Sequence, residues 1–133
     1  MKQRKVSIIL AVVLCIVLST FLLAGCGKQS PNFRELYEGL SDKYGWTLGG
    51  DGSYLSADTN VFDLDDYSSS AILYEIKDMN RKLGLPESLW NDMANTTWSM
   101  GRQEESFEDI GIKVTWTYHP DKGMEVSYKL INH

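Results

Sequence analysis

The C-terminal part of the chain alternates between apolar and polar side chains, and this alternation constrains the fold more than any other feature. From Ile112 to Tyr118, and again from Met124 to Leu130, every second residue is apolar. Because successive side chains of a strand point to opposite faces, both segments are predicted to be strands with one buried face. The short polar segment between them indicates a hairpin.

The length of the turn decides whether the two apolar faces lie on the same side of the sheet. A four-residue loop, 120–123, would place them on opposite sides. A three-residue loop, 121–123, with Gly123 in the left-handed conformation, places them on the same side. We therefore predict the cross-strand pairs Trp116–Tyr128 and Tyr118–Val126.

Further short strands are predicted before this hairpin. Residues 98–107 read as a strand that turns back through 108–111, and residues 46–48 and 54–59 flank a glycine-rich turn at 49–52. These segments indicate an antiparallel sheet, because each is joined to the next strand by a short turn.

Three helices are predicted from apolar residues at helical spacing. The first begins at Ser30 and ends at Gly45, the second carries Ile72, Ile76, Met79 and Leu83, and the third begins after Pro86. Gly84 is expected to end the second helix in a left-handed conformation. The sequence thus predicts a single small α+β domain over residues 30–133, with two or three helices packed on one face of an antiparallel sheet that ends in a C-terminal meander or hairpin.

The start of the chain has the features of an export signal. Lys2, Arg4 and Lys5 precede an apolar run, and the run ends in Leu23-Ala24-Gly25-Cys26. This four-residue segment resembles the lipobox of bacterial lipoprotein precursors. An uncleaved membrane helix is the alternative, since the run reaches the length that spans a bilayer. The small residues before Cys26 favour the lipobox, whereas Cys15 follows large residues.

The resemblance implies a cleaved signal peptide at 1–25, a lipidated Cys26 and a short tether at 26–29. In that family the cysteine carries a diacylglycerol thioether, with fatty acyl chains such as palmitate, and becomes the N-terminus. Two acyl chains hold a protein stably at a membrane. The expected location is therefore the extracytoplasmic face of the cell membrane. The domain resembles small lipoproteins of Gram-positive bacteria in its general plan alone. Because no other cysteine follows Cys26, the domain is expected to fold without a disulfide.

The charge of the chain excludes one class of partner. Three of the 13 basic residues and none of the 18 acidic ones lie in the predicted signal, which leaves a mature charge of −8. Such a domain is a poor nucleic-acid ligand, because phosphate neutralisation needs Lys and Arg. The acidity is explained by solubility alone, or it attracts cationic peptides or proteins to the membrane.

Aromatic residues are the main candidates for ligand contact. Trp116, Tyr118 and Tyr128 share one predicted sheet face, as a stacking platform or as core, and we favour the core because the domain has no disulfide. Trp46, Trp90 and Trp98 lie near the ends of predicted elements. These three tryptophans are therefore expected to be partly exposed and to contact a ligand or the membrane interface.

Metal and catalytic sites are weakly indicated. The acidic segment 58–66 is rich in carboxylates but lacks the glycine and glutamate of an EF-hand loop, so a calcium site there stays open. His119 lies at a predicted turn and His133 is the last residue. Glu104 and Glu105 are neighbours on a predicted strand and point to opposite faces. We therefore predict no metal, no cofactor and no catalytic residue.

These observations favour a non-enzymatic, membrane-anchored binding or interaction module. The alternatives are an immunity or interception lipoprotein for cationic peptides, a small cell-wall-active enzyme, and a sugar-binding module. Candidate partners are the membrane, through the lipid, and a protein, a cationic peptide or the cell wall.

Overall fold

The computed structural model describes residues 30–59 and 66–131. The predicted signal peptide with Cys26, most of the acidic segment 58–66, and His133 lie outside these residues. Within the described ranges, no helix combines the length and apolar character needed to cross a membrane.

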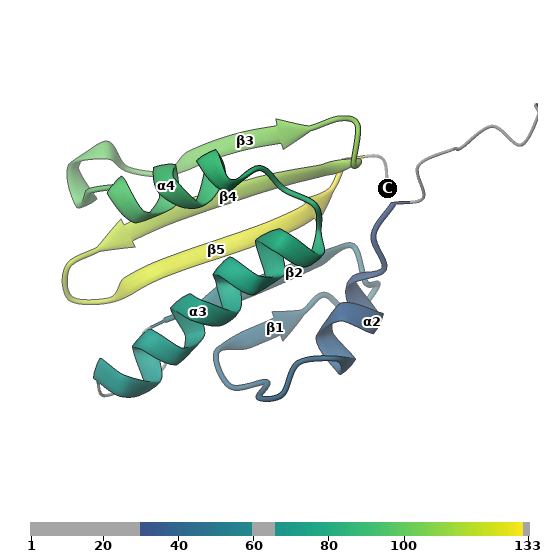
Figure 1. Ribbon diagram of the computed structural model, residues 1–133, viewed down its shortest axis with the longest axis horizontal. Coiled ribbons are helices and arrows are strands. Elements are labelled where there is room, and N and C mark those ends of the chain that lie inside the picture. The colour runs from purple at the N-terminus through teal and green to yellow at the C-terminus, as the bar shows by residue number, and fades with distance from the viewer. Residues whose placement is uncertain (1–29, 60–65, 132–133) are drawn as a thin grey trace, which may run out of the picture.

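Five antiparallel strands form one sheet in the order β1-β2-β5-β4-β3 (Figure 1). The two longest strands, β4 and β5, lie side by side near the centre, and β3 and β1 form the two edges. The bounds are β1 Trp46–Leu48, β2 Tyr54–Asp58, β3 Gln103–Phe107, β4 Ile112–His119 and β5 Gly123–Leu130.

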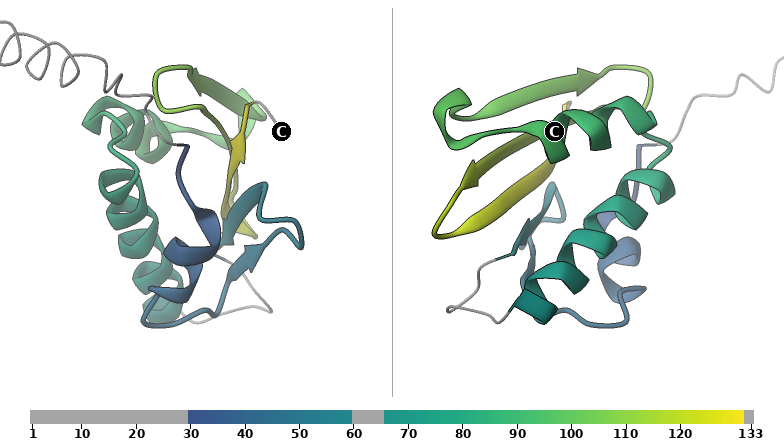
Figure 2. Two further views of the ribbon diagram at one scale, coloured as in Figure 1. Left: turned by 90° about the vertical axis from the view of Figure 1, so that its right-hand side faces the viewer. Right: turned by 60° about the vertical axis from the view of Figure 1, so that its left-hand side comes forward.

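The three α-helices of the described residues lie on one face of this sheet (Figure 2). Their bounds are α2 Phe33–Glu38, α3 Asp66–Lys82 and α4 Glu87–Asn95, and a short 3₁₀-helix, η1 Trp98–Met100, leads into β3. The α+β fold predicted from the sequence, with helices on one face of an antiparallel sheet, is confirmed. The opposite face carries no helix among the described residues.

The predicted register of the C-terminal hairpin is wrong by two residues, although its faces are right. Trp116 pairs with Val126, and His119 pairs with Gly123. The loop is residues 120–122, because Lys122 N donates to His119 O at 3.1 Å and Pro120 takes the second position of this turn, which suits its fixed φ. The loop has three residues in either register, so the apolar faces still coincide. Gly123 is left-handed as predicted, with φ 72°.

The first helix is shorter than predicted. Asn32, not Ser30, caps it, and the Asn32 side chain accepts a hydrogen bond from Glu35 N at 3.3 Å. Asparagine is among the strongest N-cap residues, which explains the later start. The helix ends at Glu38 and Gly39, so Tyr44 lies beyond it and is 46% exposed.

The end of α3 is the turn predicted at Gly84. Gly84 has φ 71°, its N–H donates to Arg81 O at 3.0 Å, and Leu85 N donates to Asn80 O at 2.9 Å. These two bonds define a Schellman motif. Leu85 is buried, so the same turn that ends α3 also anchors the start of α4 against the core.

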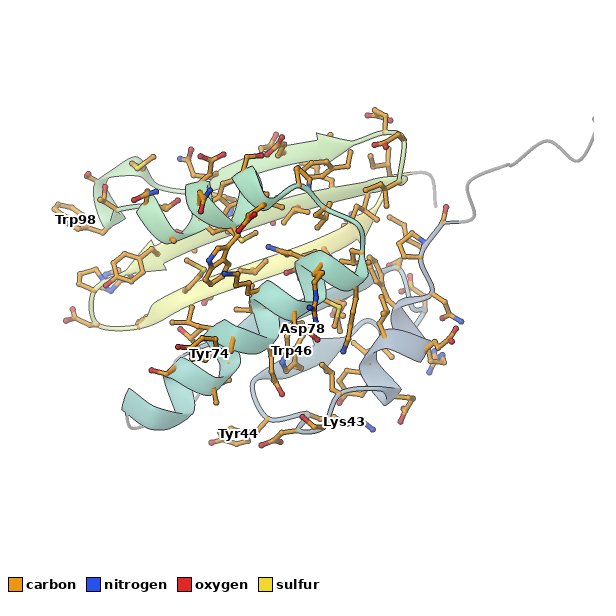
Figure 3. The ribbon with its side chains drawn as sticks, in the orientation of Figure 1. Lys43, Tyr44, Trp46, Tyr74, Asp78 and Trp98 are labelled. Atoms are coloured by element: carbon orange, nitrogen blue, oxygen red, sulfur yellow. The ribbon has the colours of Figure 1, made fainter. Side chains whose placement is uncertain are left out.

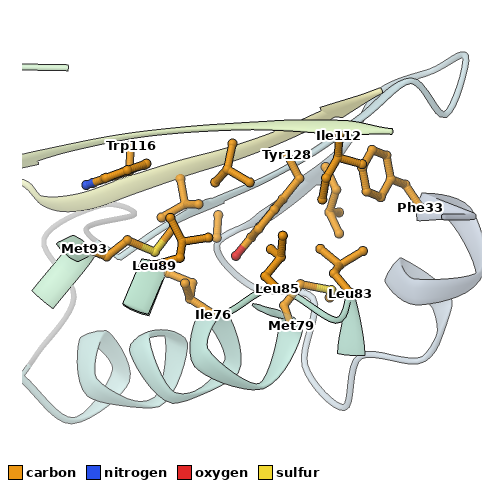
Figure 4. Packing of buried hydrophobic residues seen from close by; sticks show 14 of the residues in the cluster. Phe33, Ile76, Met79, Leu83, Leu85, Leu89, Met93, Ile112, Trp116 and Tyr128 are labelled. Carbon is orange, nitrogen blue, oxygen red and sulfur yellow. The ribbon is translucent and has the colours of Figure 1, made fainter. Parts of the chain in front are cut away.

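The core lies between the helices and the covered face of the sheet (Figure 4). Trp116 and Tyr128 are buried there, and Tyr118 is half-buried against it. The interpretation of these sheet aromatics as core residues is confirmed. The largest fully buried side chains come from both layers: Phe33, Leu55, Ile76, Met79, Leu89, Met93, Ile112, Val114, Val126 and Tyr128.

One buried polar cluster joins the layers. Tyr128 Oη donates to Asn80 Oδ1 at 2.6 Å, and Asn80 Nδ2 lies 3.5 Å from Met93 Sδ. Burial raises the pKa of Tyr128 far above its usual value. The phenol therefore stays neutral and acts as a donor from β5 to α3, while the amide of Asn80 reaches α4.

Candidate functional site

The face of the sheet that the helices leave open carries a row of hydroxyl side chains across four strands. Thr47 pairs with Ser56, Ser56 with Ser127, and Ser127 with Thr115. The row continues on β3 with Glu104, the partner of Thr115. Cross-strand partners share one face of a sheet, so these side chains form a single polar line.

Charges of both signs surround this hydroxyl row. Arg102, Asp58 and Glu125 line a shallow depression of about 420 Å³ with the hydroxyls. The pairing of Lys113 with Lys129 places two cations on the other side of the row. The open face of the sheet is therefore a polar surface that carries charges of both signs.

A groove between α3 and α4, which we call the α3–α4 groove, lies on the outer surface of the helix layer. Its volume is about 520 Å³, and Tyr74, Lys77 and Arg81 line it together with Glu87 and Trp90. Tyr74 is 75% exposed, and Lys77 Nζ lies 5.8 Å from the centre of the Trp90 ring. A cation at this distance is attracted by the ring.

Charged residues of α3 beside the α3–α4 groove form ion pairs with one another. Asp78 forms ion pairs with Lys82, at 3.0 Å, and with Arg81. Hydrogen bonds from Lys82 and then from Arg81 lower the pKa of Asp78. Because these charges neutralise one another, the exposed ring of Tyr74 and the half-buried ring of Trp90 are the aromatic surface that the groove offers.

The three candidate tryptophans lie at three separate places. Trp46 is 5% exposed and its Nε1 donates to Glu75 Oε2 on α3 at 2.9 Å, so the expected partial exposure is wrong for this residue. Its position at the start of β1 puts it under α3, which covers it. Trp90 is half-buried at the α3–α4 groove, and Trp98 is 67% exposed. Ligand contact by any of them stays a prediction.

A cleft opens beside β3, the edge strand that follows Trp98. It measures about 360 Å³ and is lined by Asp92 of α4, Met100 of η1, Glu104 and Glu105 of β3, and Trp116. Trp116 Nε1 donates to Thr96 Oγ1 at 2.8 Å, and Thr96 Oγ1 donates to Asp92 O at 2.7 Å. These bonds fix the end of α4 against the sheet and hold the wall of the cleft.

The glutamates and the histidine considered for catalysis lie on the sheet: Glu104 and Glu105 on β3, and His119 at the end of β4. Glu104 Oε2 lies 2.8 Å from Lys113 Nζ, whereas Glu105 is the partner of Val114, whose side chain belongs to the covered face. His119 is exposed, and its Nδ1 accepts a hydrogen bond from Asp121 N within its own turn. Across residues 30–59 and 66–131, no group of three His, Cys, Asp or Glu could hold a metal ion.

Three features of these surfaces were not found from the sequence. Tyr74 lies two residues from both Ile72 and Ile76, so the helical period that buries those residues could have predicted its exposure. The hydroxyl row could have been read from the polar positions of the alternating strands. The cleft at β3 joins residues from four separate elements, and no local pattern predicts it.

Comparison with protein-family models, with curated proteins and with solved structures finds no match.

Proposed function

We propose that this protein is a lipid-anchored lipoprotein of the extracytoplasmic membrane face, whose domain acts by binding and not by catalysis. The observation that carries the anchor is Leu23-Ala24-Gly25-Cys26 directly after a basic start and an apolar run. The mature charge of −8 supports a lipid anchor, because anionic headgroups would repel the domain itself.

The start of the described chain supports one orientation of the anchored domain. Ser30 lies against Gly111 in the turn after β3, and Gly111 O accepts a hydrogen bond from Ile131 N. Residues 27–29 extend by about 3.5 Å each at most, so a lipid on Cys26 would hold this end of the sheet close to the bilayer. Trp98 projects from the other end of β3 (Figure 3). In this orientation Trp98 faces away from the membrane and is available to a partner.

The exposed aromatic side chains support a binding role. Tyr74 and Trp98 are more than half exposed although both are large, and tyrosine and tryptophan are enriched among the residues that dominate binding energy at interfaces. Glu104 and Glu105 point to opposite sides of β3, which argues against their acting together on one bond. We therefore favour a binding module over a hydrolase.

Replacement of Cys26 tests the anchor. The full chain is expressed in a Gram-positive host that is fed an alkyne analogue of palmitate, and the labelled protein is detected after membrane fractionation. Cys26→Ala should lose the label and remain as a larger, unprocessed precursor, because the lipid acceptor is gone. The matched control Cys15→Ala should keep both the label and the processing.

Two results would contradict the proposal. One is a label that persists in Cys26→Ala or disappears in Cys15→Ala, which would mean that Cys26 is not the acceptor. The other is digestion of purified peptidoglycan by the wild-type protein but not by Glu105→Gln, which would assign the domain to catalysis.

A further inference from the structure

The sheet has two edges, and they differ in length and in cover. β1 has three residues and contacts α2, whereas β3 has five residues. No described strand pairs with the outer side of β3, so this side presents unpaired backbone N–H and C=O groups. We call this side, Gln103–Phe107, the β3 edge. It is the only long edge that the described part of the sheet offers.

Exposed carboxylates lie along the β3 edge. Glu104 and Glu105 project to the two sides of the sheet. Glu104 already forms an ion pair with Lys113, whereas Glu105 and Asp92 line the same cleft from β3 and α4. Like charges directly opposite one another destabilise a strand pair. Antiparallel pairing of two β3 edges centred on Glu104 or on Glu105 would place that residue directly opposite the same residue of the second copy. The carboxylates therefore disfavour self-association and favour a strand that carries Lys or Arg.

An apolar anchor precedes the β3 edge. Trp98 is 67% exposed and Met100 is 51% exposed, and among the large apolar residues of the described chain only Tyr74 is more exposed. Met100 also lines the cleft with the carboxylates, and the buried indole of Trp116 forms part of its wall. A cationic side chain that enters the cleft would meet the carboxylates of Glu105 and Asp92, which attract cations.

We propose that the β3 edge binds an extended, cationic segment of a partner protein as an added strand, with Trp98 and Met100 in contact with an apolar residue of that segment. Backbone hydrogen bonds supply the affinity in this mode, and side chains at alternate positions supply the specificity. The charged residues that line the cleft beside β3 are all acidic, whereas the α3–α4 groove and the open sheet face each combine both signs of charge and do not select a cationic segment. The proposal rests on the binding role proposed above and names its site and ligand class.

A synthetic strand tests this site. The full-length protein is reconstituted in phosphatidylcholine vesicles, and a fluorescent peptide of alternating Lys and Val is titrated by anisotropy. Binding should weaken steeply as salt rises, because the attraction is screened. A peptide of alternating Glu and Val should not bind. A Lys-Val peptide methylated at the alternate backbone nitrogens should bind far more weakly, because it cannot donate to the edge.

Variants locate the bound peptide. Glu105→Gln should weaken binding of the Lys-Val peptide by about two- to fivefold and Glu105→Lys by about tenfold, the range expected for exposed charge pairs. Trp98→Ala should weaken it by about tenfold. Glu125→Gln on the open sheet face and Glu87→Gln at the α3–α4 groove are matched controls and should leave affinity unchanged. All four side chains are exposed, so the variants should fold, which circular dichroism checks.

Each outcome separates this proposal from the one it rests on. If the peptide binds but Glu125→Gln or Glu87→Gln weakens it while Glu105→Lys does not, the β3 edge is the wrong surface and a binding role stands. If the backbone-methylated peptide binds equally well, strand addition is wrong. If the Lys-Val peptide does not bind at low salt, the cationic ligand is wrong, while the labelling of Cys26 still decides the anchor.

Discussion

The two faces of the sheet are built from the same strands and differ in almost every physical property. Along β5, Val126 and Tyr128 are buried under the helices, whereas the alternate residues Ser127 and Lys129 face the open side. The covered face is apolar and includes a fully buried tyrosine, and the open face carries hydroxyl groups and mixed charges. The difference indicates that burial on the covered face stabilises the fold, whereas the open face and the edges of the sheet are accessible to solvent and to other molecules.

Replacement of neighbouring residues on β5 should give the largest contrast between the faces. Tyr128→Ala removes a fully buried ring and leaves Asn80 without its hydrogen bond, so we expect a loss of about 3–5 kcal/mol in the free energy of unfolding. Ser127→Ala, one residue away on the open face, should change it by less than about 0.5 kcal/mol. Urea denaturation of both variants measures this. Equal losses would mean that the open face is also packed.

Alkaline pH should lower the free energy of unfolding through Tyr128 on the covered face. Because burial raises the pKa of Tyr128 in the folded state, the unfolded chain releases this proton first, at its ordinary pKa of about 10. The stabilisation is complete below that pKa and is lost as the pH rises above it. Between pH 9 and 11 the wild-type protein should lose about 1.4 kcal/mol more than Tyr128→Phe.

The comparison with Tyr128→Phe isolates this one group, since the six other tyrosines are present in both proteins. Urea midpoints at several pH values provide the measurement. Parallel pH curves for the two proteins would show that the Tyr128 hydroxyl is accessible to water.

A charge pair at the border of the open face should give the smallest effect. Lys113 Nζ and Glu104 Oε2 are 2.8 Å apart, and both side chains are more than one-third exposed. Lys113→Ala should therefore cost at most about 0.2–1 kcal/mol, and less at high salt. Thermal unfolding at low and high salt checks this. A loss that is larger and insensitive to salt would contradict the description of this face as solvated.

The sidedness of the sheet could be predicted from the sequence, because the alternation of apolar residues in β4 and β5 fixes which side chains share a face. The register could not be predicted, since a loop at 120–122 and one at 121–123 give the same faces. Pro120 and the bond from Lys122 to His119 decide between them. The end of α3 could be predicted from Gly84. The start of α2 could not, because Ser30 and Asn32 are both favourable N-cap residues.

The candidate surfaces were less predictable, because exposure depends on what another element covers. Trp46 and Trp98 each stand at the start of a strand predicted from the sequence. In the structure, α3 covers Trp46, whereas nothing described covers Trp98. The edge position of β3 follows from the strand order, in which β5 lies between β2 and β4. This long-range pairing is not encoded in any local pattern.

Asn80 has a mechanical consequence. It contributes to the wall of the α3–α4 groove, accepts the hydroxyl of Tyr128 and reaches Met93. The Asn80 side chain thus connects α3, α4 and the central strand β5 at one point, so neither helix can shift along the sheet without breaking a buried contact. The α3–α4 groove is consequently preformed, and a ligand would enter it without first ordering its walls, which lowers the entropic penalty of binding.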